Sequence, residues 1–181
     1  MDKLSQIAHL LVEFFFYAYI LIVMLRFLLQ LVRADFYNPL SQFIVYATNP
    51  VILPLRKVIP GFFGIDLASI ILAILLQMLA LQLLGFIAGQ GVYPILNLLV
   101  FSVFKLIISL LNIYFFSFII MVVISWIAPH SHNPAISLIS SITEPVLRPI
   151  RRVVPAVGGL DFSVMIAMLG IVIIKILLGA G

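Results

Sequence analysis

Cysteine is absent from this 181-residue sequence, and charged residues make up only 9% of it. Without cysteine the chain forms no disulfide, no thiolate metal site and no thiol nucleophile. Its formal net charge of +4 is too small and too dispersed to indicate a nucleic-acid-binding surface. The scarcity of charge accompanies 65% hydrophobic residues, which is more apolar surface than a soluble domain of this size could bury.

Recognisable catalytic motifs are missing as well. The sequence has no Ser/His/Asp spacing, no phosphate-binding glycine loop and no paired carboxylates. His130 and His132 form a His-x-His motif, but two ligands do not complete a metal site. We therefore expect a protein that is not an enzyme and that holds neither a metal nor a cofactor.

The hydrophobic residues are grouped in four long blocks. Each block approaches or exceeds the ~20 residues that cross a bilayer core. The first is not a cleavable signal peptide, because its apolar core is too long and no small-x-small site follows it. The blocks predict an all-α polytopic membrane protein with four transmembrane helices, at 7–32, 67–88, 95–127 and 162–178.

The sequence also contains an internal repeat. A shift of 95 residues aligns 38–67 with 133–162 without a gap, and 12 of the 30 pairs are identical, including four prolines. Because proline fixes backbone dihedrals, the matched prolines imply the same chain path twice. We expect a first repeat in 1–94 and a second in 95–181, each made of a helix, a polar segment and a helix.

The repeats predict a membrane topology. Two crossings per repeat give both repeats the same orientation, so the polar segments 33–65 and 128–160 lie on one side. The positive-inside rule places these segments in the cytoplasm and both termini on the opposite side of the membrane. The basic residues that identify the side are Arg33, Arg56, Lys57, Arg148, Arg151 and Arg152.

Each polar segment has a recognisable beginning. Asn38 and Asn133 each precede a proline, which is typical of an N-cap followed by the first helical residue. We expect a short helix after each asparagine, ended by Pro50 or Pro145. After the proline, each segment has apolar residues on both sides of a basic pair. This pattern is typical of a segment that lies in the headgroup layer.

The second repeat carries the motifs of a known family. These are Ser125-Trp126, Asn133-Pro134, Thr143-Glu144-Pro145, the run from Leu147 to Arg152, Pro155, and the run from Gly158 to Ser163. In this set the sequence resembles the YggT/YlmG family of small membrane proteins, in its two-repeat proteobacterial branch. Glu144 stands where that family usually has aspartate before the proline, and the first repeat has Asn49 there.

The resemblance implies a multi-pass protein of the bacterial inner membrane, whose two termini are then periplasmic, but it implies no agreed biochemical activity. Members of the family are associated with osmotic or envelope stress, ion homeostasis, cell-division gene neighbourhoods and plastid membrane functions. We expect a non-enzymatic component of the inner membrane that contacts lipid or a protein partner through its basic cytoplasmic segments. The alternative is a small ion channel or transporter component that uses polar residues between the repeats. Homo-oligomer formation stays open.

Basic residues of the polar segments are the first candidate site. Two interpretations are open: cations that anchor the topology on anionic headgroups, each contributing ~1 kcal/mol, or a specific site for an anionic lipid or an acidic partner segment. The residues are Arg56, Lys57, Arg148, Arg151 and Arg152.

Asp66 and Asp161 stand where spanning helices begin. A carboxylate at that position caps free N–H groups and meets the positive end of the helix dipole. Each aspartate also follows an arginine by ten residues, Arg56 or Arg151. We expect both a cap and an ion pair, since a carboxylate has several acceptor sites.

Charged residues within the apolar blocks form the last candidate set. Glu13, Lys105 and Lys175 all fall toward the outer leaflet, where they either pair with one another or extend toward the surface. Arg26, Gln30 and Arg33 share one face of the first block near the cytoplasm, where we expect them to extend toward the headgroups.

Overall fold

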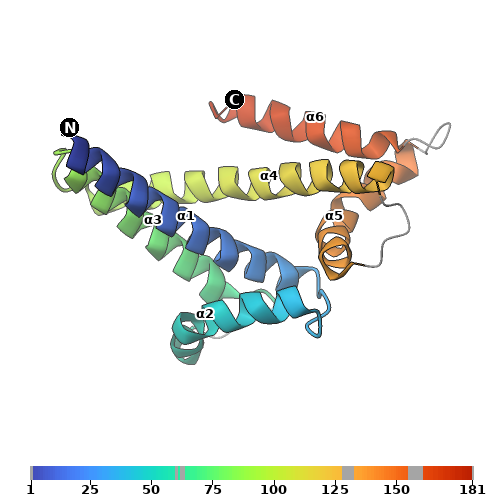
Figure 1. Ribbon diagram of the computed structural model, residues 1–181, viewed down its shortest axis with the longest axis horizontal. Helices are drawn as coiled ribbons and strands as arrows, with labels where there is room; N and C mark the ends of the chain where they lie inside the picture. Colours follow the sequence, from blue (N-terminus) through green and yellow to red (C-terminus); the bar gives the residue numbers. More distant parts are fainter. Residues whose placement is uncertain (1, 60, 62–63, 128–132, 155–160, 181) are drawn as a thin grey trace. The chain divides into compact units, whose positions relative to one another are not determined.

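The computed structural model describes residues 2–59, 61, 64–127, 133–154 and 161–180. This part of the chain is all α-helical, and Figure 1 labels its six helices. They are α1 (Lys3–Leu31), α2 (Pro39–Val58), α3 (Leu67–Ile87), α4 (Ile95–Ile127), α5 (Pro134–Val153) and α6 (Phe162–Leu177).

The helix boundaries repeat with the spacing of the sequence. Helices α2 and α5 begin 95 residues apart and also end 95 residues apart, and α3 and α6 begin 95 residues apart. Both α3 and α6 are followed, two residues after their last helical residue, by a glycine with a positive φ, Gly89 at 73° and Gly179 at 70°. Glycine adopts this left-handed conformation without the steric cost of a side chain, so it terminates a helix well.

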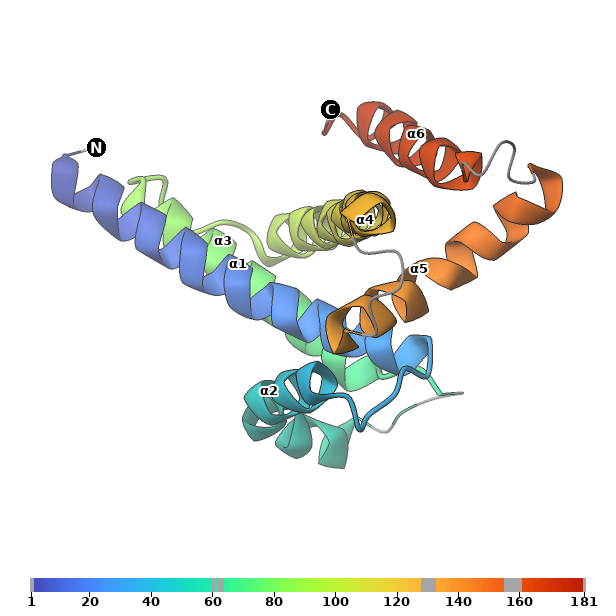
Figure 2. The ribbon, with the colours of Figure 1, turned by 45° about the vertical axis from the view of Figure 1, so that its right-hand side comes forward.

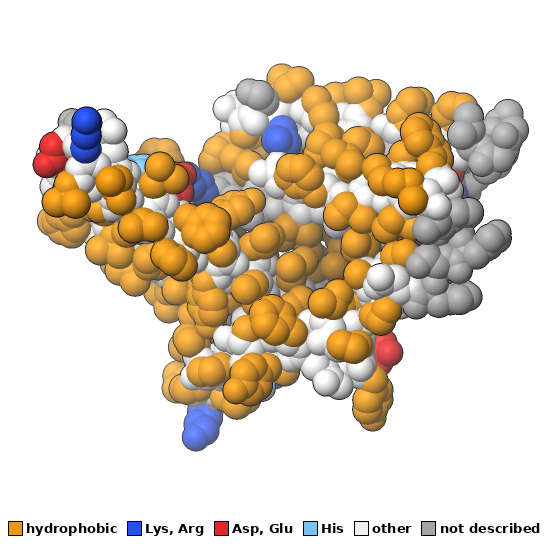
Figure 3. Space-filling model, viewed as in Figure 1, with side chains coloured by type: hydrophobic (Ala, Val, Ile, Leu, Met, Phe, Trp, Pro, Cys, Tyr) orange, Lys and Arg blue, Asp and Glu red, His pale blue; other side chains and the backbone are white. Residues whose placement is uncertain are grey.

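Three of the described helices are long and apolar enough to cross a membrane: α1, α3 and α4. Their outer surfaces are largely hydrophobic, and few charged groups appear on the face in Figure 3. Helix α6 is equally apolar but has 16 residues, about 24 Å at 1.5 Å per residue. That is shorter than a bilayer core of about 30 Å, so the length of α6 alone does not establish the expected fourth membrane span.

Proline does not end the helices of the polar segments. The expectation that Pro50 and Pro145 stop a short helix is wrong, because α2 and α5 each continue through two internal prolines. A proline removes one N–H and crowds the preceding turn, yet its φ is helical, so the helix can bend instead of stopping. Figure 1 shows α2 changing direction along its length.

The chain divides into two compact units. Unit 1 comprises Met1–Leu31 and Phe43–Ile107, and unit 2 comprises Val32–Gln42 and Ile108–Gly181. Helix α4 is therefore divided between them, as is α2, whose first residues belong to unit 2. These limits differ from a repeat boundary at 94/95, which stays a prediction from the sequence.

In unit 1, α1 packs along α3, and the two helices lie side by side in Figures 1 and 2. Small buried residues on α3, Ala73 and Ala80, allow this close approach. In unit 2, α5 packs against α6. Its core joins Phe118 of α4, Leu147 of α5 and Ala167 of α6.

Candidate functional site

Both polar-segment helices begin at a capping asparagine. Asn38 Oδ1 accepts a hydrogen bond from the N–H of Leu40 at 2.9 Å, and Asn133 Oδ1 accepts one from Ala135 at 2.9 Å. The expected N-caps are confirmed in both repeats. The amide of Asn38 has a further role, because its Nδ2 donates to the carbonyl of Pro134 at 2.7 Å and so ties the start of α2 to the start of α5 within unit 2.

Arg56 and Asp66 form an ion pair that joins three helices. Arg56 Nη2 donates to Asp66 Oδ2 at 2.6 Å and to Gln30 Oε1 at 2.7 Å. Asp66 is the N-cap of α3, where it accepts from the N–H of Ser69. Arg56 lies in the last turn of α2 and Gln30 near the end of α1, so the guanidinium links α1, α2 and α3.

Arg26 adds a second cation to this cluster, which we call the first junction (Arg26, Gln30, Thr48, Asn49, Arg56 and Asp66). Its Nη1 donates to Thr48 Oγ1 at 2.6 Å and to Asn49 Oδ1 at 2.8 Å. Its Nε lies 3.9 Å from Asp66 Oδ2. The side chain is only 6% exposed, so the expectation that Arg26 extends to the headgroups is wrong.

The part played by Arg26, Thr48 and Asn49 was missed in the sequence, although a signal existed. Arg26 and Gln30 are four residues apart on one helical face, and both contribute to the junction. Thr48 is one of the residues that repeats, as Thr143, and it is fully buried. Its hydroxyl accepts from Arg26 and donates to the carbonyl of Ile44 at 2.6 Å. Arg33 lies outside the junction, exposed just after α1.

Repeat two builds a second junction from Glu144, Arg151 and Asp161. Arg151 Nε donates to Asp161 Oδ2 at 2.8 Å, and Arg151 Nη1 donates to Glu144 Oε2 at 2.7 Å. Asp161 is the N-cap of α6 and accepts from the N–H of Ser163 at 3.0 Å. All three charged side chains are more than a third exposed, with Asp161 at 34% and Glu144 at 51%.

The pKa of each junction aspartate is lowered. Burial of Asp66 acts to raise its pKa, but hydrogen bonds from Arg56 and Ser69 and the charge of Arg56 outweigh that effect. Asp161 follows the same balance, with Ser163 and Arg151 as the stabilising partners of its carboxylate. Both groups are therefore ionised acceptors at neutral pH, which is the state that an ion pair and a helix cap require.

The five basic residues of the first candidate set fall into two kinds. Arg56 and Arg151 are engaged by the aspartates. Lys57, Arg148 and Arg152 are exposed, and the described residues give them no ion-pair partner within 4.0 Å. The second group keeps its charge available to ligands at the surface of α2 and α5.

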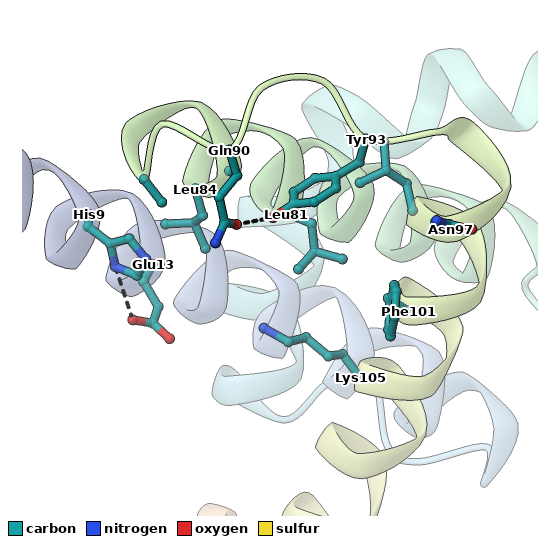
Figure 4. Close-up of a pocket in the computed structure, with 12 residues that line it drawn as sticks. His9, Glu13, Leu81, Leu84, Gln90, Tyr93, Asn97, Phe101 and Lys105 are labelled. Carbon is teal, nitrogen blue, oxygen red and sulfur yellow. Dashed lines mark hydrogen bonds and ion pairs between the residues drawn. The ribbon is translucent and has the colours of Figure 1, made fainter. Parts of the chain in front are cut away.

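Two of the intramembrane charges share a cavity. Glu13 and Lys105 both line it, in unit 1 (Figure 4). The carboxylate nevertheless lies within ion-pair distance of His9, at 3.8 Å, and among the described contacts it has no direct pair with Lys105. Lys175 lies in the last turn of α6, in unit 2. The motif of His130 and His132 lies outside the described residues, and the described residues include no group of three potential metal ligands.

Relatives of the chain share most of its length. The sequence is 52% identical over 160 residues to the uncharacterized protein PA0392 of Pseudomonas aeruginosa, covering 88% of this chain and 81% of the relative. It is 40% identical over 170 residues to an uncharacterized protein in the proC 3'region of Vibrio alginolyticus, covering 93% and 91%. It is 36% identical over 158 residues to the uncharacterized protein YggT of Escherichia coli, covering 87% and 81%. No solved structure matches.

The family comparison reproduces the internal repeat. The CCB3/YggT family model matches the chain twice, at residues 5–87 and 100–180, and the two matches begin 95 residues apart. Together they cover the helices that build both junctions. This chain therefore belongs to the CCB3/YggT family and is a multi-pass membrane protein.

Proposed function

We propose that this protein is a non-enzymatic component of the bacterial inner membrane whose helices α2 and α5 lie in the cytoplasmic headgroup layer and bind anionic lipid. Lys57, Arg148 and Arg152 supply the charge. The physiological setting that we propose, following the resemblance to the family, is envelope and ion homeostasis under osmotic stress.

The surface of α2 is the observation that carries this proposal. Its inner face buries Ile44, Thr48 and Ile52, at successive intervals of four residues. Its outer face nevertheless exposes large apolar side chains, which water solvates poorly, beside a basic last turn. A helix of this kind suits the boundary between acyl chains and phosphates. The exposed apolar residues are Leu40, Phe43, Tyr46, Val51, Leu53 and Val58.

The junctions support the same proposal by fixing the interfacial helices. Arg56 attaches the last turn of α2 to the N-cap of α3, and Arg151 attaches the last turn of α5 to the N-cap of α6. Charge-assisted bonds of this type are short and directional. These bonds fix the directions of α2 and α5 relative to the helices that follow them. They therefore also fix the positions of the neighbouring cations, Lys57 and Arg152.

The proposal includes α6 as the fourth membrane span. Helix α6 begins at the same repeat position as α3 and carries a single charge near its end, Lys175. A hydrophobic stretch shorter than the bilayer is accommodated by local thinning and by flanking lysines that extend to the interface. Reporter fusions test the topology: those after Gly61 and Gly158 should read cytoplasmic, and those after Gly91 and Gly181 periplasmic. A periplasmic reading at Gly61 would overturn the orientation.

Hydrogen exchange in nanodiscs tests lipid binding. We expect amides of α2 and α5 to exchange severalfold more slowly when phosphatidylglycerol is added to a phosphatidylethanolamine bilayer. The triple variant K57Q/R148Q/R152Q should lose this protection while Arg56 and Arg151 keep the junctions intact. A matched variant, K3Q/K175Q, removes cations from other parts of the chain and should behave as the wild type. Equal exchange with and without phosphatidylglycerol would contradict the proposal, as would equal loss in both variants.

Osmotic challenge tests the physiological part. Cells that lack the protein should recover growth after a hyperosmotic shift when they express the wild type or K3Q/K175Q, and recover less with K57Q/R148Q/R152Q. Full complementation by the triple variant would separate the stress phenotype from lipid binding.

A further inference from the structure

A cavity of about 500 Å³ opens in unit 1, at the end of α1 that carries Glu13 (Figure 4). It is lined by the first half of α1, the end of α3, the loop after it and the first half of α4. Glu13 lies 13 residues before Arg26 on α1, about 20 Å along the helix axis. The cavity is therefore remote from the first junction and from the basic residues of α2.

Charges of opposite sign face this cavity from different helices. Figure 4 shows the side chains of Glu13, from α1, and Lys105, from α4, both directed into the open space. Within the described residues, Lys105 has no ion-pair partner inside 4.0 Å, and the only such neighbour of Glu13 is His9. Charged groups on apolar helices are costly unless they are paired or face a wet or occupied cavity.

One wall of the cavity is held in place by hydrogen bonds. Gln82 of α3 accepts from the backbone N–H of Tyr93 and donates to the carbonyl of Gly91, each at 3.1 Å. The Tyr93 ring lies so close to Gly85 that a Cβ at this position would clash with the ring. Tyr93 also donates its hydroxyl proton to Gln90 Oε1, which leaves the amide nitrogen of Gln90 free to donate toward the cavity.

The remaining lining is largely apolar. Leu81, Leu84 and Ala88 of the α3 end and Leu98 and Phe101 of α4 contribute to it. A cavity of this volume, mostly apolar with a few convergent polar groups, is typical of small-ligand sites. The charges define the ligand: an anion alone would meet the carboxylate of Glu13, and a cation alone would meet the ammonium of Lys105.

We propose that this cavity binds a zwitterion, with its ammonium group at Glu13 and its anionic oxygens at Lys105. Gln90 and Asn97 offer neutral hydrogen bonds beside them. Two sources supply this chemistry, the phosphoethanolamine headgroup of a membrane lipid and a small zwitterion from solution. The cavity differs from the proposed lipid-binding surface of α2 and α5, whose charged groups are all cations. Either proposal can therefore be refuted without the other.

Native mass spectrometry of the delipidated protein in detergent tests the site. Phosphatidylethanolamine and phosphatidylglycerol with matched acyl chains are titrated separately, and soluble phosphoethanolamine is titrated by calorimetry. We expect at least a tenfold weaker affinity for the zwitterion in both E13Q and K105M. K175M, which removes a lysine of another apolar helix, is the matched control and should bind as the wild type. Both Glu13 and Lys105 are exposed, so these substitutions leave the fold intact, which thermal melting verifies.

The outcomes separate the two sources and can reject the site. Binding of phosphatidylethanolamine without phosphoethanolamine identifies a lipid site, and binding of phosphoethanolamine identifies a site open to solution. In the K57Q/R148Q/R152Q variant, which lacks the free cations of α2 and α5, equal affinity for phosphatidylglycerol and phosphatidylethanolamine would overturn the proposal. So would wild-type affinity in either E13Q or K105M, or the absence of binding by both zwitterions.

Discussion

The same arginine–aspartate pair occurs twice in this molecule, once buried and once exposed. In the first junction Asp66 is 2% exposed, and in the second Asp161 is 34% exposed. Both aspartates cap the helix that follows and accept from an arginine ten residues earlier, Arg56 or Arg151. Duplication has therefore kept the pair and changed its surroundings.

The third charged member of each junction differs in sign. The first junction adds a buried cation, Arg26, whose repeat equivalent is the uncharged Met121. The second adds an anion, Glu144, whose repeat equivalent is the neutral Asn49. Arg26 is satisfied by neutral oxygens, because a buried site cannot rely on water, whereas Glu144 is half-exposed and solvated. The duplicated arginine–aspartate pair thus tolerates an additional positive or negative charge, provided that the additional group is hydrogen-bonded or solvated.

Removal of the aspartate should give the largest difference between the junctions. Asp66→Ala leaves Arg26 and Arg56 without their carboxylate in a buried site, and we expect a loss of about 3–5 kcal/mol. Asp161→Ala removes an exposed pair and a helix cap, for a loss of about 1–2 kcal/mol. Denaturation in mixed micelles measures both. Asp161→Asn should retain much of the cap, and equal losses for the two alanine variants would refute the contrast in burial.

An exchange of the third members should sharpen the comparison. Arg26→Met introduces the residue of the second repeat and leaves Thr48 and Asn49 with unsatisfied oxygens, which we expect to cost about 1–3 kcal/mol. The double variant Arg26→Met/Asn49→Glu recreates the composition of the second junction, because Arg56 can then reach a glutamate as Arg151 does. It should recover part of the loss. A double variant less stable than Arg26→Met alone would show that the buried first junction cannot accommodate the arginine–glutamate contact of the exposed second junction.

Acidification should weaken both junctions. The folded-state pKa of each aspartate is lowered, whereas the unfolded value is about 3.9. Their contribution to stability is therefore complete above that value and is lost as pH falls through the lower folded-state pKa. Melting temperatures from roughly pH 6 downward should decline less steeply in Asp66→Asn than in the wild type. An unchanged slope in Asp66→Asn would rule out this carboxylate as the source.

Glu144 should give the smallest effect. Glu144→Gln breaks an exposed contact with Arg151 and keeps the Arg151–Asp161 pair, so we expect a loss of about 0.2–1 kcal/mol that salt diminishes. Melting at two ionic strengths measures it. A loss as large as that of Asp161→Ala would mean that the glutamate, not the aspartate, holds the second junction.

Local sequence signals predicted the ends of helices better than their interiors. Asn-Pro fixed the starts of α2 and α5, and the ten-residue spacing of Arg56 and Asp66 predicted their contact, because caps and short separations depend on few atoms. The break expected at Pro50 failed because packing of Ile44 and Ile52 on either side carries the helix through the proline. Burial of Arg26 also escaped prediction, since it depends on how α1 meets α2, which composition alone does not encode.

Helix length separates the two apolar runs that follow the aspartates. The predicted helix at 162–178 agrees with α6 to within one residue, but α6 stops before Gly179 after 16 residues whereas α3 runs for 21 residues. The fourth membrane span therefore stays a prediction. Hydrophobicity fixes where a helix enters an apolar environment. The position of the terminating glycine fixes how far it continues.

Helix α4 has a consequence for any attempt to divide the gene. Its residues to Ile107 belong with unit 1, although they follow the repeat boundary proposed at residue 94. A first-half fragment that ends there lacks Asn97 and Lys105, and with them one wall of the cavity. Split fragments should therefore complement each other more readily when the cut falls after Ile107 than when it separates the two ancestral copies, since a duplicated gene need not leave two self-sufficient proteins.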